Sequence, residues 1–367
     1  MKAAVLFAPN TPFVIEQVTL ASPRAGEVLV RIAATGVCRS DHHVMTGATR
    51  HPLPVVCGHE GAGVVTAVGP DVTHVKPSDH VVLSWAPSCG SCFYCRGGLP
   101  AQCEAFIKAV WDGTMLDGTT RLSLDGRALH HYCLLASFAE QTVVPASCCV
   151  PIRKDVPLTV AALVGCAVAT GVGAALFRAK VAPGSSVAVF GCGGVGVNIV
   201  QGCLLSGATR IIAVDKNRAR LGIARQLGAT DVVDASAQDP VELVRQMTDG
   251  RGADYTFEAI GSPATMTQAI EAARRGGTIV LVGLGGHAES LALGAGSFTR
   301  SDKVLTSAYY GGCDPQRDMP KLIDLYMEGR LKLDELIGRR RPLSEINEAF
   351  ADLAAGDVIR TLITFDA

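Results

Sequence analysis

The chain has 367 residues, which is long enough for two domains that each bury a core. Hydrophobic residues make up 48% and charged residues 18%, a balance typical of a globular enzyme rather than of a disordered or fibrous protein. The formal net charge of −1 gives no electrostatic reason to expect nucleic acid or an anionic membrane as a partner.

The chain contains thirteen cysteines, and its first residues, MKAAVLFAPN, do not have the pattern of a signal peptide. Cysteines in such a chain are expected to be metal ligands or buried thiols in a reducing compartment. We therefore expect a cytoplasmic protein.

The chain up to about residue 150 has the pattern of a mostly antiparallel β domain. Short runs rich in β-branched residues alternate with turns that contain glycine or proline. Strands are expected at 3–7, 27–36, 61–69, 79–85 and 141–147. This pattern favours a core that is partly barrel-like.

Four cysteines in this first part have the spacing C-x2-C-x2-C-x7-C: Cys89, Cys92, Cys95 and Cys103. Glycines and a proline supply tight turns between them. Four thiolates at this spacing can converge on one tetrahedral Zn²⁺ and leave no position open for a substrate. The spacing therefore predicts a structural zinc site.

Residues 156–177 form a run of 22 uncharged residues, long enough to cross a bilayer. The run is rich in alanine, glycine and threonine, lacks flanking aromatic residues and lies between strand-like segments. We expect a helix that is buried in the core of the protein, and no membrane partner.

From about residue 165 strands and helices alternate, which predicts an α/β fold with a doubly wound parallel sheet of six strands. Strands are expected at 185–191, 210–215, 253–261, 277–283 and 303–311, and helices at 195–207, 218–229 and 263–277. The tail is expected to form helices at 319–329 and 343–356 and a strand at 361–365. We expect a domain of residues 1–167, completed by 310–367, and a nucleotide-binding domain of residues 168–309.

A glycine-rich turn joins the strand at 185–191 to the following helix. Gly191, Gly193 and Gly196 form a G-x-G-x-x-G motif, in which Gly194 and Val195 lie between the last two glycines. Such glycines allow a tight turn, close approach of a pyrophosphate and close packing of helix on strand. Asp215 ends the next strand, where its carboxylate would accept hydrogen bonds from a ribose and repel a 2′-phosphate, so NAD is favoured over NADP.

Cys38, His59 and Cys166 lie in the segments GVCRSDHH, GHEGAG and GCAVATG. Two thiolates and an imidazole are a ligand set that suits a catalytic zinc with an open fourth position. Buried cysteine is common, however, so spacing alone leaves this assignment open. Most of the other seven cysteines are expected to be inert core thiols: Cys57, Cys133, Cys148, Cys149, Cys192, Cys203 and Cys313.

These motifs, together with GDVIRTLITF near the end of the chain, occur in the order found in one family. The chain resembles the zinc-dependent alcohol dehydrogenases of the medium-chain dehydrogenase/reductase superfamily, of the type with a structural zinc. The resemblance runs nearly end to end. It implies a GroES-like catalytic domain, a Rossmann domain that binds NAD, and two zinc ions per chain.

The resemblance also implies roles for individual residues. Cys38, His59 and Cys166 would bind the catalytic zinc, the four clustered cysteines would bind the structural zinc, and Asp41 and Glu60 would orient the ligands. Ser40 and His43 would relay a proton away from the alcohol during hydride transfer to NAD. Cofactor contacts are implied for Arg39 and Arg360 at the pyrophosphate, for Thr170, Val195 and Val282 at the nicotinamide, and for Arg220 near the adenosine ribose. Lys216 and Arg220 leave some room for NADP.

The family lines its alcohol channel at the positions of Trp85, Tyr132, Cys133, Leu284 and Tyr309. Three aromatic rings favour a flat apolar substrate such as a benzylic or cinnamylic alcohol. The same rings could instead narrow the channel and select small primary alcohols. We expect reversible oxidation of aromatic or longer primary alcohols to aldehydes.

Three other functions stay open. An S-hydroxymethylglutathione (formaldehyde) dehydrogenase of this family relies on an acid and an arginine, whereas this chain has Thr49 and Ile107 near those two positions. Lys108 could stand in for the arginine. A nicotinoprotein would keep its NAD bound and pass electrons to an external acceptor. A non-catalytic binding protein on the same fold would be expected to have lost some of Cys38, Ser40, His43, His59 and Cys166, and all five are present.

The segment WDGTMLDGTTRLSLDGRALHH follows the four-cysteine cluster. Members of the family with this insert resemble the dimeric type. We therefore expect a homodimer that joins edge to edge through the nucleotide-binding domains.

Overall fold

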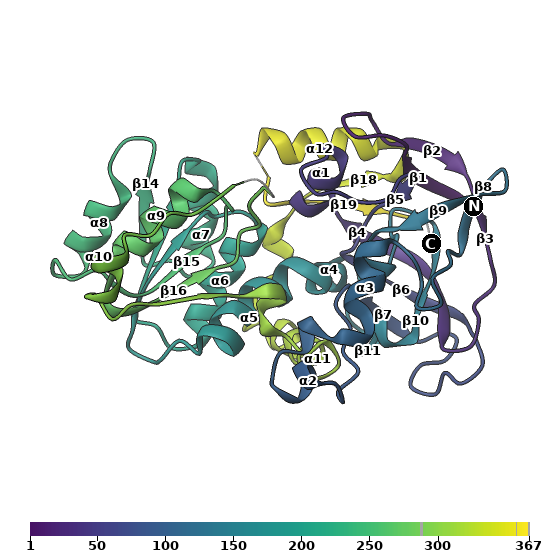
Figure 1. The fold of residues 1–367 in the computed structure, drawn as a ribbon, viewed down its shortest axis with the longest axis horizontal. Helices are drawn as coiled ribbons and strands as arrows, with labels where there is room; N and C mark the ends of the chain where they lie inside the picture. Colours follow the sequence, from purple (N-terminus) through teal and green to yellow (C-terminus); the bar gives the residue numbers. More distant parts are fainter. Residues whose placement is uncertain (287–288, 357, 366–367) are drawn as a thin grey trace. The chain divides into compact units, whose positions relative to one another are not determined.

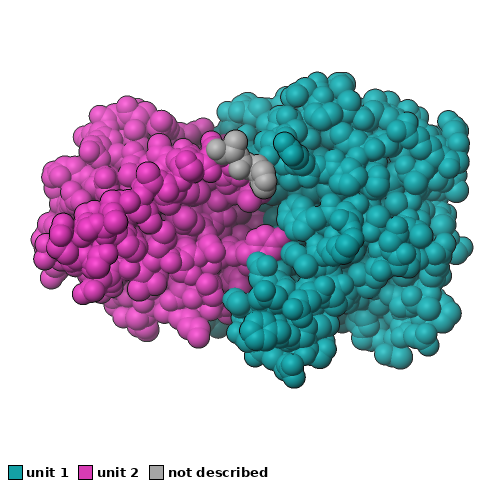
Figure 2. Space-filling view, viewed as in Figure 1, with its two compact units in different colours: residues 1–166, 313–367 teal, residues 167–312 magenta. Residues whose placement is uncertain are grey.

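The computed structural model describes residues 1–286, 289–356 and 358–365. These residues divide into two compact units, Met1–Cys166 with Cys313–Ala367 and Ala167–Gly312, which are coloured separately in Figure 2. The expected domain limits differ from these by one to three residues. Residues 287–288, 357 and 366–367 also fall within the expected domains but lie outside the described residues.

The first unit is built on two mostly antiparallel sheets (Figure 1). Their strand orders are β2-β1-β5-β9-β8-β3 and β11-β7-β6-β4-β19-β18, and β10 also pairs with β4. The strands are β1 (Lys2–Leu6), β2 (Val14–Gln17), β3 (Thr19–Leu20), β4 (Glu27–Gly36), β5 (Val55–Val56), β6 (Gly61–Val68), β7 (His80–Leu83), β8 (Leu122–Leu124), β9 (Arg127–His131), β10 (Gln141–Pro145), β11 (Cys149–Ile152), β18 (Ile337–Pro342) and β19 (Arg360–Thr364).

The helices of the first unit are α1 (Arg39–Met45), α2 (Phe93–Arg96), α3 (Glu104–Asp112), α4 (Leu158–Leu163), α11 (Pro315–Met327) and α12 (Ile346–Ala355). The last two, with β18 and β19, come from the tail of the chain. β19 pairs with the central strand β4, so the tail adds two strands to a sheet that begins near the N-terminus. The inward side chains of both sheets form one apolar core.

The second unit is built on a six-stranded sheet of order β14-β13-β12-β15-β16-β17, in which the paired strands are parallel. Its strands are β12 (Ser186–Phe190), β13 (Arg210–Asp215), β14 (Asp231–Asp234), β15 (Ala253–Glu258), β16 (Ala273–Leu281) and β17 (Val304–Ser307). Its helices are α5 (Ala169–Gly173), α6 (Gly194–Leu205), α7 (Arg218–Gln226), α8 (Pro240–Met247), α9 (Pro263–Ala272) and α10 (Ala295–Thr299). Helices α6, α7, α8 and α9 pack against this sheet (Figure 1).

The predicted fold class is confirmed, because a barrel-like antiparallel domain accompanies a doubly wound parallel sheet. Some elements differ in extent. The strand expected at 303–311 ends at Ser307 and is followed by the 3-10 turn Tyr309–Gly312, and the helix expected at 263–277 ends at Ala272, because strand β16 begins at Ala273. Ala273 already pairs with Ala253 of β15, and this sheet pairing takes the residues that helical periodicity had assigned to α9. The sixth strand, β14, has four residues, and the sequence predicted six strands without a range for this one.

The apolar run expected to be a buried helix is helical from Leu158 to Ala179. It is long and apolar enough to cross a membrane, but 89% of its most apolar window is buried inside the protein. Two stretches of it, Val164–Val168 and Ala174–Ala179, have π-helical hydrogen bonding. Such wider turns are frequent at functional sites, and the first of them contains Cys166.

Candidate active site

Cys38, His59 and Cys166 come together from three separate elements of the first unit. Cys38 caps the N-terminus of α1, His59 lies between β5 and β6, and Cys166 lies in the π-helical stretch after α4. The three ligand atoms lie within 4.8 Å of one another, and all three residues are buried. Two sulfurs and one nitrogen at this spacing fit a zinc ion that keeps a fourth position open.

Asp41 positions residues of this cluster through hydrogen bonds. Its side chain is fully buried, and Oδ1 accepts hydrogen bonds from His59 Nδ1 at 3.1 Å and from the Gly58 backbone N–H at 3.0 Å. Oδ2 accepts a hydrogen bond from the Cys38 backbone N–H at 3.3 Å. Because Nδ1 of His59 donates to Asp41, Nε2 is the nitrogen that remains for a metal.

Glu60 and Arg360 form a buried ion pair beside the cluster. The guanidinium of Arg360 donates to Glu60 Oε2 at 3.0 Å, to Cys38 Sγ at 3.7 Å and to the Val37 carbonyl at 3.3 Å. Arg360 is only 5% exposed, so this side chain lies among the metal-site residues. Its expected contact with a cofactor pyrophosphate stays a prediction.

Hydrogen bonds, burial and nearby charges shift the pKa values of the three candidate ligands, and the hydrogen bond with Cys38 raises the pKa of Cys166. A hydrogen bond from Cys166 lowers the pKa of the Cys38 thiol well below its usual value; burial opposes this shift, and Arg360 and His59 reinforce it. Burial lowers the pKa of His59, but Asp41 and Cys38 outweigh it and leave that pKa raised. Cys38 is therefore poised as the thiolate that a metal requires.

Two of the five expected channel residues lie around His59. The ring of Tyr132 meets the imidazole of His59 edge to face at a centroid distance of 5.5 Å, and the indole of Trp85 meets it at 6.4 Å. Cys133 is 3% exposed and belongs to the apolar core of the first unit. Leu284 and Tyr309 belong to the second unit, where Leu284 is exposed and Tyr309 is half-buried.

The expected relay residues follow Cys38 on helix α1. Ser40 Oγ lies 3.9 Å from Cys38 Sγ and is half-buried, as is His43. The neighbouring His42 stacks against Phe350 of α12 at 6.4 Å, and burial lowers its pKa. Arg39, the first residue of the helix, is exposed.

The four clustered cysteines also converge. Sγ of Cys89 lies 4.0 Å from that of Cys95, and Sγ of Cys92 lies 3.9 Å from that of Cys103. Tetrahedral Zn–S bonds of about 2.3 Å would separate the sulfurs by roughly 3.8 Å. The sulfurs thus fit one zinc ion, and this arrangement has no non-sulfur position left for a substrate.

Backbone and hydroxyl donors prepare this cluster for a metal. A hydrogen bond from Ser91, with further ones from backbone N–H groups, lowers the pKa of Cys89 to about 6. Burial raises the pKa of Cys103 to about 12. The exposed Cys89 thiol therefore ionises at lower pH than the buried Cys103 thiol, and metal binding would have to displace the proton of Cys103.

In the second unit the glycine-rich turn has the geometry that its sequence predicts. Gly191 has a φ of +96°, which favours glycine. A Cβ on Gly196 would lie 1.7 Å from the Gly191 carbonyl oxygen, whereas a Cβ on Gly193 would meet no atom within 4 Å. Gly193 therefore leaves open space at the N-terminus of α6, where free N–H groups favour a phosphate.

Asp215 stands at the end of β13 beside this turn. Its Oδ2 accepts a hydrogen bond from the Cys192 backbone N–H at 2.7 Å, and Oδ1 accepts one from Asn217 at 2.8 Å. Among the other expected cofactor contacts, Thr170 is 9% exposed, and Val195, Val282 and Arg220 are half-buried or nearly so. The carboxylate of Asp215 is thus hydrogen-bonded to the glycine-rich turn beside which it is expected to bind the ribose.

All seven cysteines outside the two clusters are buried, as expected for core thiols. Lys108, the possible stand-in in a glutathione site, is exposed and pairs with Asp112. The prediction from sequence missed two residues that connect to Tyr132. The ring of His51 lies 5.4 Å from that of Tyr132, and the buried Arg121 donates its backbone N–H to His131, the residue before Tyr132. Neither belongs to a motif, so only their tertiary contacts reveal them.

Two family models match the chain. The model of the alcohol dehydrogenase GroES-like domain matches residues 24–154, and that of the zinc-binding dehydrogenase matches residues 194–328. Together they span both units.

Solved structures match the whole chain. An alcohol dehydrogenase zinc-binding domain protein from Burkholderia ambifaria is 37% identical, with a TM-score of 0.95 over 100% of this chain and 99% of that one. The benzyl alcohol dehydrogenase from Acinetobacter calcoaceticus is 33% identical, with a TM-score of 0.94 over 100% and 99%. A putative zinc-binding dehydrogenase from Sinorhizobium meliloti 1021, solved bound to NADP, is 25% identical, with a TM-score of 0.80 over 99% of each chain.

Proposed function

The chain belongs to the zinc-dependent alcohol dehydrogenases of the medium-chain dehydrogenase/reductase superfamily, and from this premise we propose that it oxidises aromatic or longer-chain primary alcohols to aldehydes with NAD as the hydride acceptor. The reaction is reversible and falls in EC 1.1.1.-. The observation that carries the proposal is the buried Cys38, His59 and Cys166 cluster, flanked by the rings of Trp85 and Tyr132.

Cys38, His59 and Cys166 would hold the catalytic zinc, which when bound acts as a Lewis acid and lowers the pKa of an alcohol hydroxyl. Asp41 keeps the His59 imidazole in the tautomer that presents Nε2, and Glu60 with Arg360 keeps the charge beside Cys38 balanced. Cys89, Cys92, Cys95 and Cys103 would hold the structural zinc. We propose two zinc ions per chain.

Ser40 accepts the proton of the alcohol hydroxyl within the buried site and passes it outward to His43. Both follow Cys38 on α1, and Ser40 Oγ already lies 3.9 Å from Cys38 Sγ. Histidine suits the outer position because its pKa lies close to neutral pH. The neighbouring His42 is a poorer candidate, since its ring stacks on Phe350 and burial lowers its pKa.

The glycine-rich turn would hold the NAD pyrophosphate at the N-terminus of α6, together with Arg39 and Arg360. Asp215 favours NAD because its carboxylate would repel a 2′-phosphate. Thr170, Val195 and Val282 would flank the nicotinamide. Lys216 and Arg220 leave room for slower turnover with NADP, the ligand found in the Sinorhizobium meliloti relative.

The aromatic substrate class is supported by the two rings that flank His59 and by the likeness to a benzyl alcohol dehydrogenase. A flat ring can stack between such side chains and gain more than its buried area alone provides. Cys133, Leu284 and Tyr309 would complete the channel.

Steady-state kinetics of the purified enzyme test this function. Benzyl and cinnamyl alcohol should be oxidised with added NAD at a higher kcat/KM than ethanol, and the Cys166→Ser variant should remain folded but lose turnover. Faster oxidation of S-hydroxymethylglutathione than of benzyl alcohol would indicate a formaldehyde dehydrogenase. A nicotinoprotein would retain absorbing cofactor through desalting and turn over only with an external acceptor.

A further inference from the structure

Arg121 is a buried charged residue that directly precedes strand β8 of the hairpin β8–β9. Arg121 is 2% exposed, and its side chain lies against Glu27, the first residue of β4. Nε donates to Glu27 Oε2 at 2.8 Å, and Nη2 donates to Glu27 Oε1. This bidentate geometry fixes the plane of the guanidinium as well as its position.

The remaining donors of Arg121 are also used. Nη2 donates to Asp117 Oδ2 at 2.8 Å, and Nη1 donates to Thr119 Oγ1 at 2.5 Å and to the Thr120 carbonyl at 3.2 Å. All five N–H groups of the guanidinium therefore have an acceptor. Lysine, with three donors on a flexible stem, could not reproduce this set.

The backbone of Arg121 is hydrogen-bonded to the last residue of strand β9. Its N–H donates to Nε2 of His131 at 3.0 Å, and both residues are buried. Burial, with smaller contributions from Arg121 and His130, lowers the pKa of His131 to about 3. A neutral His131 can accept this hydrogen bond at Nε2, as the geometry requires.

Tyr132 follows His131 directly and is the ring that flanks the candidate metal ligand. It is 3% exposed, meets His59 at 5.5 Å, and its hydroxyl donates to the Ser40 carbonyl at 3.4 Å. A continuous series of contacts thus runs from Glu27 through Arg121 and His131 to the wall of the proposed channel.

We propose that Arg121 is a positioning residue that sets the place of the Tyr132 ring beside His59, and thereby the preference of the enzyme for aromatic over small alcohols. This inference rests on the aromatic substrate class proposed above. A displacement of an ångström at a reacting centre can cost about a hundredfold in rate, so a ring held by such a series can decide specificity.

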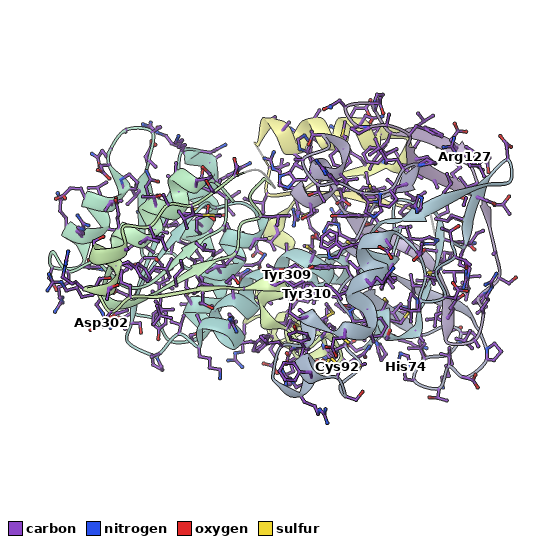
Figure 3. The ribbon with its side chains drawn as sticks, viewed as in Figure 1. His74, Cys92, Arg127, Asp302, Tyr309 and Tyr310 are labelled. Carbon is purple, nitrogen blue, oxygen red and sulfur yellow. The ribbon has the colours of Figure 1, made fainter. Side chains whose placement is uncertain are left out.

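The experiment compares Arg121→Lys, just before β8, with Arg127→Lys, a matched control on the neighbouring strand β9. Arg127 is exposed on β9 and is labelled in Figure 3. A double variant, Glu27→Gln with Arg121→Met, removes the ion pair without leaving an unpaired buried charge, in case the single variant folds poorly. Tyr132→Ala serves as the reference for loss of the ring.

Three quantities are measured for each variant: the ratio of kcat/KM for benzyl alcohol to that for ethanol, the zinc content, and the near-ultraviolet circular dichroism of the aromatic side chains. For Arg121→Lys and the double variant we expect the ratio to fall by about tenfold or more, towards that of Tyr132→Ala, with two zinc ions retained. The near-ultraviolet spectrum should change in the same direction. Arg127→Lys should match the wild type in all three.

A merely structural role would reduce the activity on both alcohols equally, and an unchanged ratio in Arg121→Lys would overturn the proposal. If the wild type does not oxidise benzyl alcohol, the proposed function fails, and the circular dichroism alone tests the positioning of the ring. An Arg121→Lys spectrum identical to the wild type would then overturn the inference.

Discussion

At the scale of single residues, Asp41 shows how one carboxylate can position candidate metal ligands without being one of them. It accepts hydrogen bonds from the backbone of Cys38, from the backbone of Gly58 and from the ring of His59. These bonds fix two of the three candidate ligands relative to each other. The buried negative charge also favours a bound cation.

Asp41→Asn should weaken zinc binding and activity by about 10- to 100-fold, because the amide keeps the shape but loses the charge and one acceptor. Zinc content after dialysis against a chelator, together with kcat, measures the effect. Asp155→Asn, at an exposed ion pair with Arg153, is the control and should retain both. Wild-type zinc retention in Asp41→Asn would contradict this role for Asp41.

Gly193 and Gly196 allow the cofactor contact to be separated from folding. A Cβ at Gly196 collides with the Gly191 carbonyl, so Gly196→Ala should destabilise the protein by about 1–3 kcal/mol. A Cβ at Gly193 meets no protein atom, so Gly193→Ala should leave the melting temperature unchanged.

The same Cβ at Gly193 would occupy space where the pyrophosphate is expected. Gly193→Ala should therefore raise the Kd for NAD by about tenfold or more, which corresponds to roughly 1.4 kcal/mol. Thermal unfolding and calorimetric titration with NAD measure the two effects. Unchanged NAD affinity in Gly193→Ala would place the pyrophosphate elsewhere.

At the scale of elements, the segment from Cys89 to Cys103 has little core of its own. Helix α2 has four residues, none of them buried, and Phe93 is 73% exposed. Apolar packing cannot order such a segment, so its geometry depends on the four sulfurs. Cys92, labelled in Figure 3, is one of them.

Cys92→Ser should leave one zinc ion per chain in place of two and should expose residues 89–103 to proteases, because a serine hydroxyl is a poor zinc ligand. Metal analysis and limited proteolysis with mass spectrometry measure this outcome. Arg96→Ala, which changes an exposed residue of the same helix, is the control. Loss of both zinc ions in Cys92→Ser would mean that the two sites are not independent.

At the scale of the whole molecule, the parallel sheet of the second unit ends in β17. This strand pairs with β16 on one side, its other edge has no strand partner among the described residues, and Val304 is 53% exposed. An exposed edge strand with apolar side chains is a template for pairing with another chain. A two-fold symmetric dimer would pair this edge with its own copy.

Light scattering should give twice the chain mass of 38.2 kDa for the wild type. Val304→Lys should give the mass of a single chain, because burying two lysines at the paired edges is unfavourable. Val232→Lys on β14, at the opposite end of the sheet, is the control and should remain dimeric. A dimeric Val304→Lys would move the interface away from this edge.

The sequence by itself determined the features that depend on local patterns of residues. Alternating strand and helix periodicity and the spacing of Gly191, Gly193 and Gly196 predicted the order of strands and helices in the second unit and the glycine-rich turn, because each of these depends on residues close together in the chain. The four-cysteine spacing likewise predicted one cluster, since its ligands lie within fifteen residues. The strand β14 and the end of α9 at Ala272 escaped, because sheet pairing rather than local pattern decides them.

Only the tertiary structure decided which distant side chains meet. Cys38 and Cys166 are separated by more than a hundred residues, and spacing alone left their pairing with His59 open. The pairing of Arg360 with Glu60, and of Arg121 with Glu27, has no sequence pattern at all. The physical reason is that a buried charge needs an oppositely charged partner close to it in space. The fold determines which residues are close in space, and their separation along the chain does not.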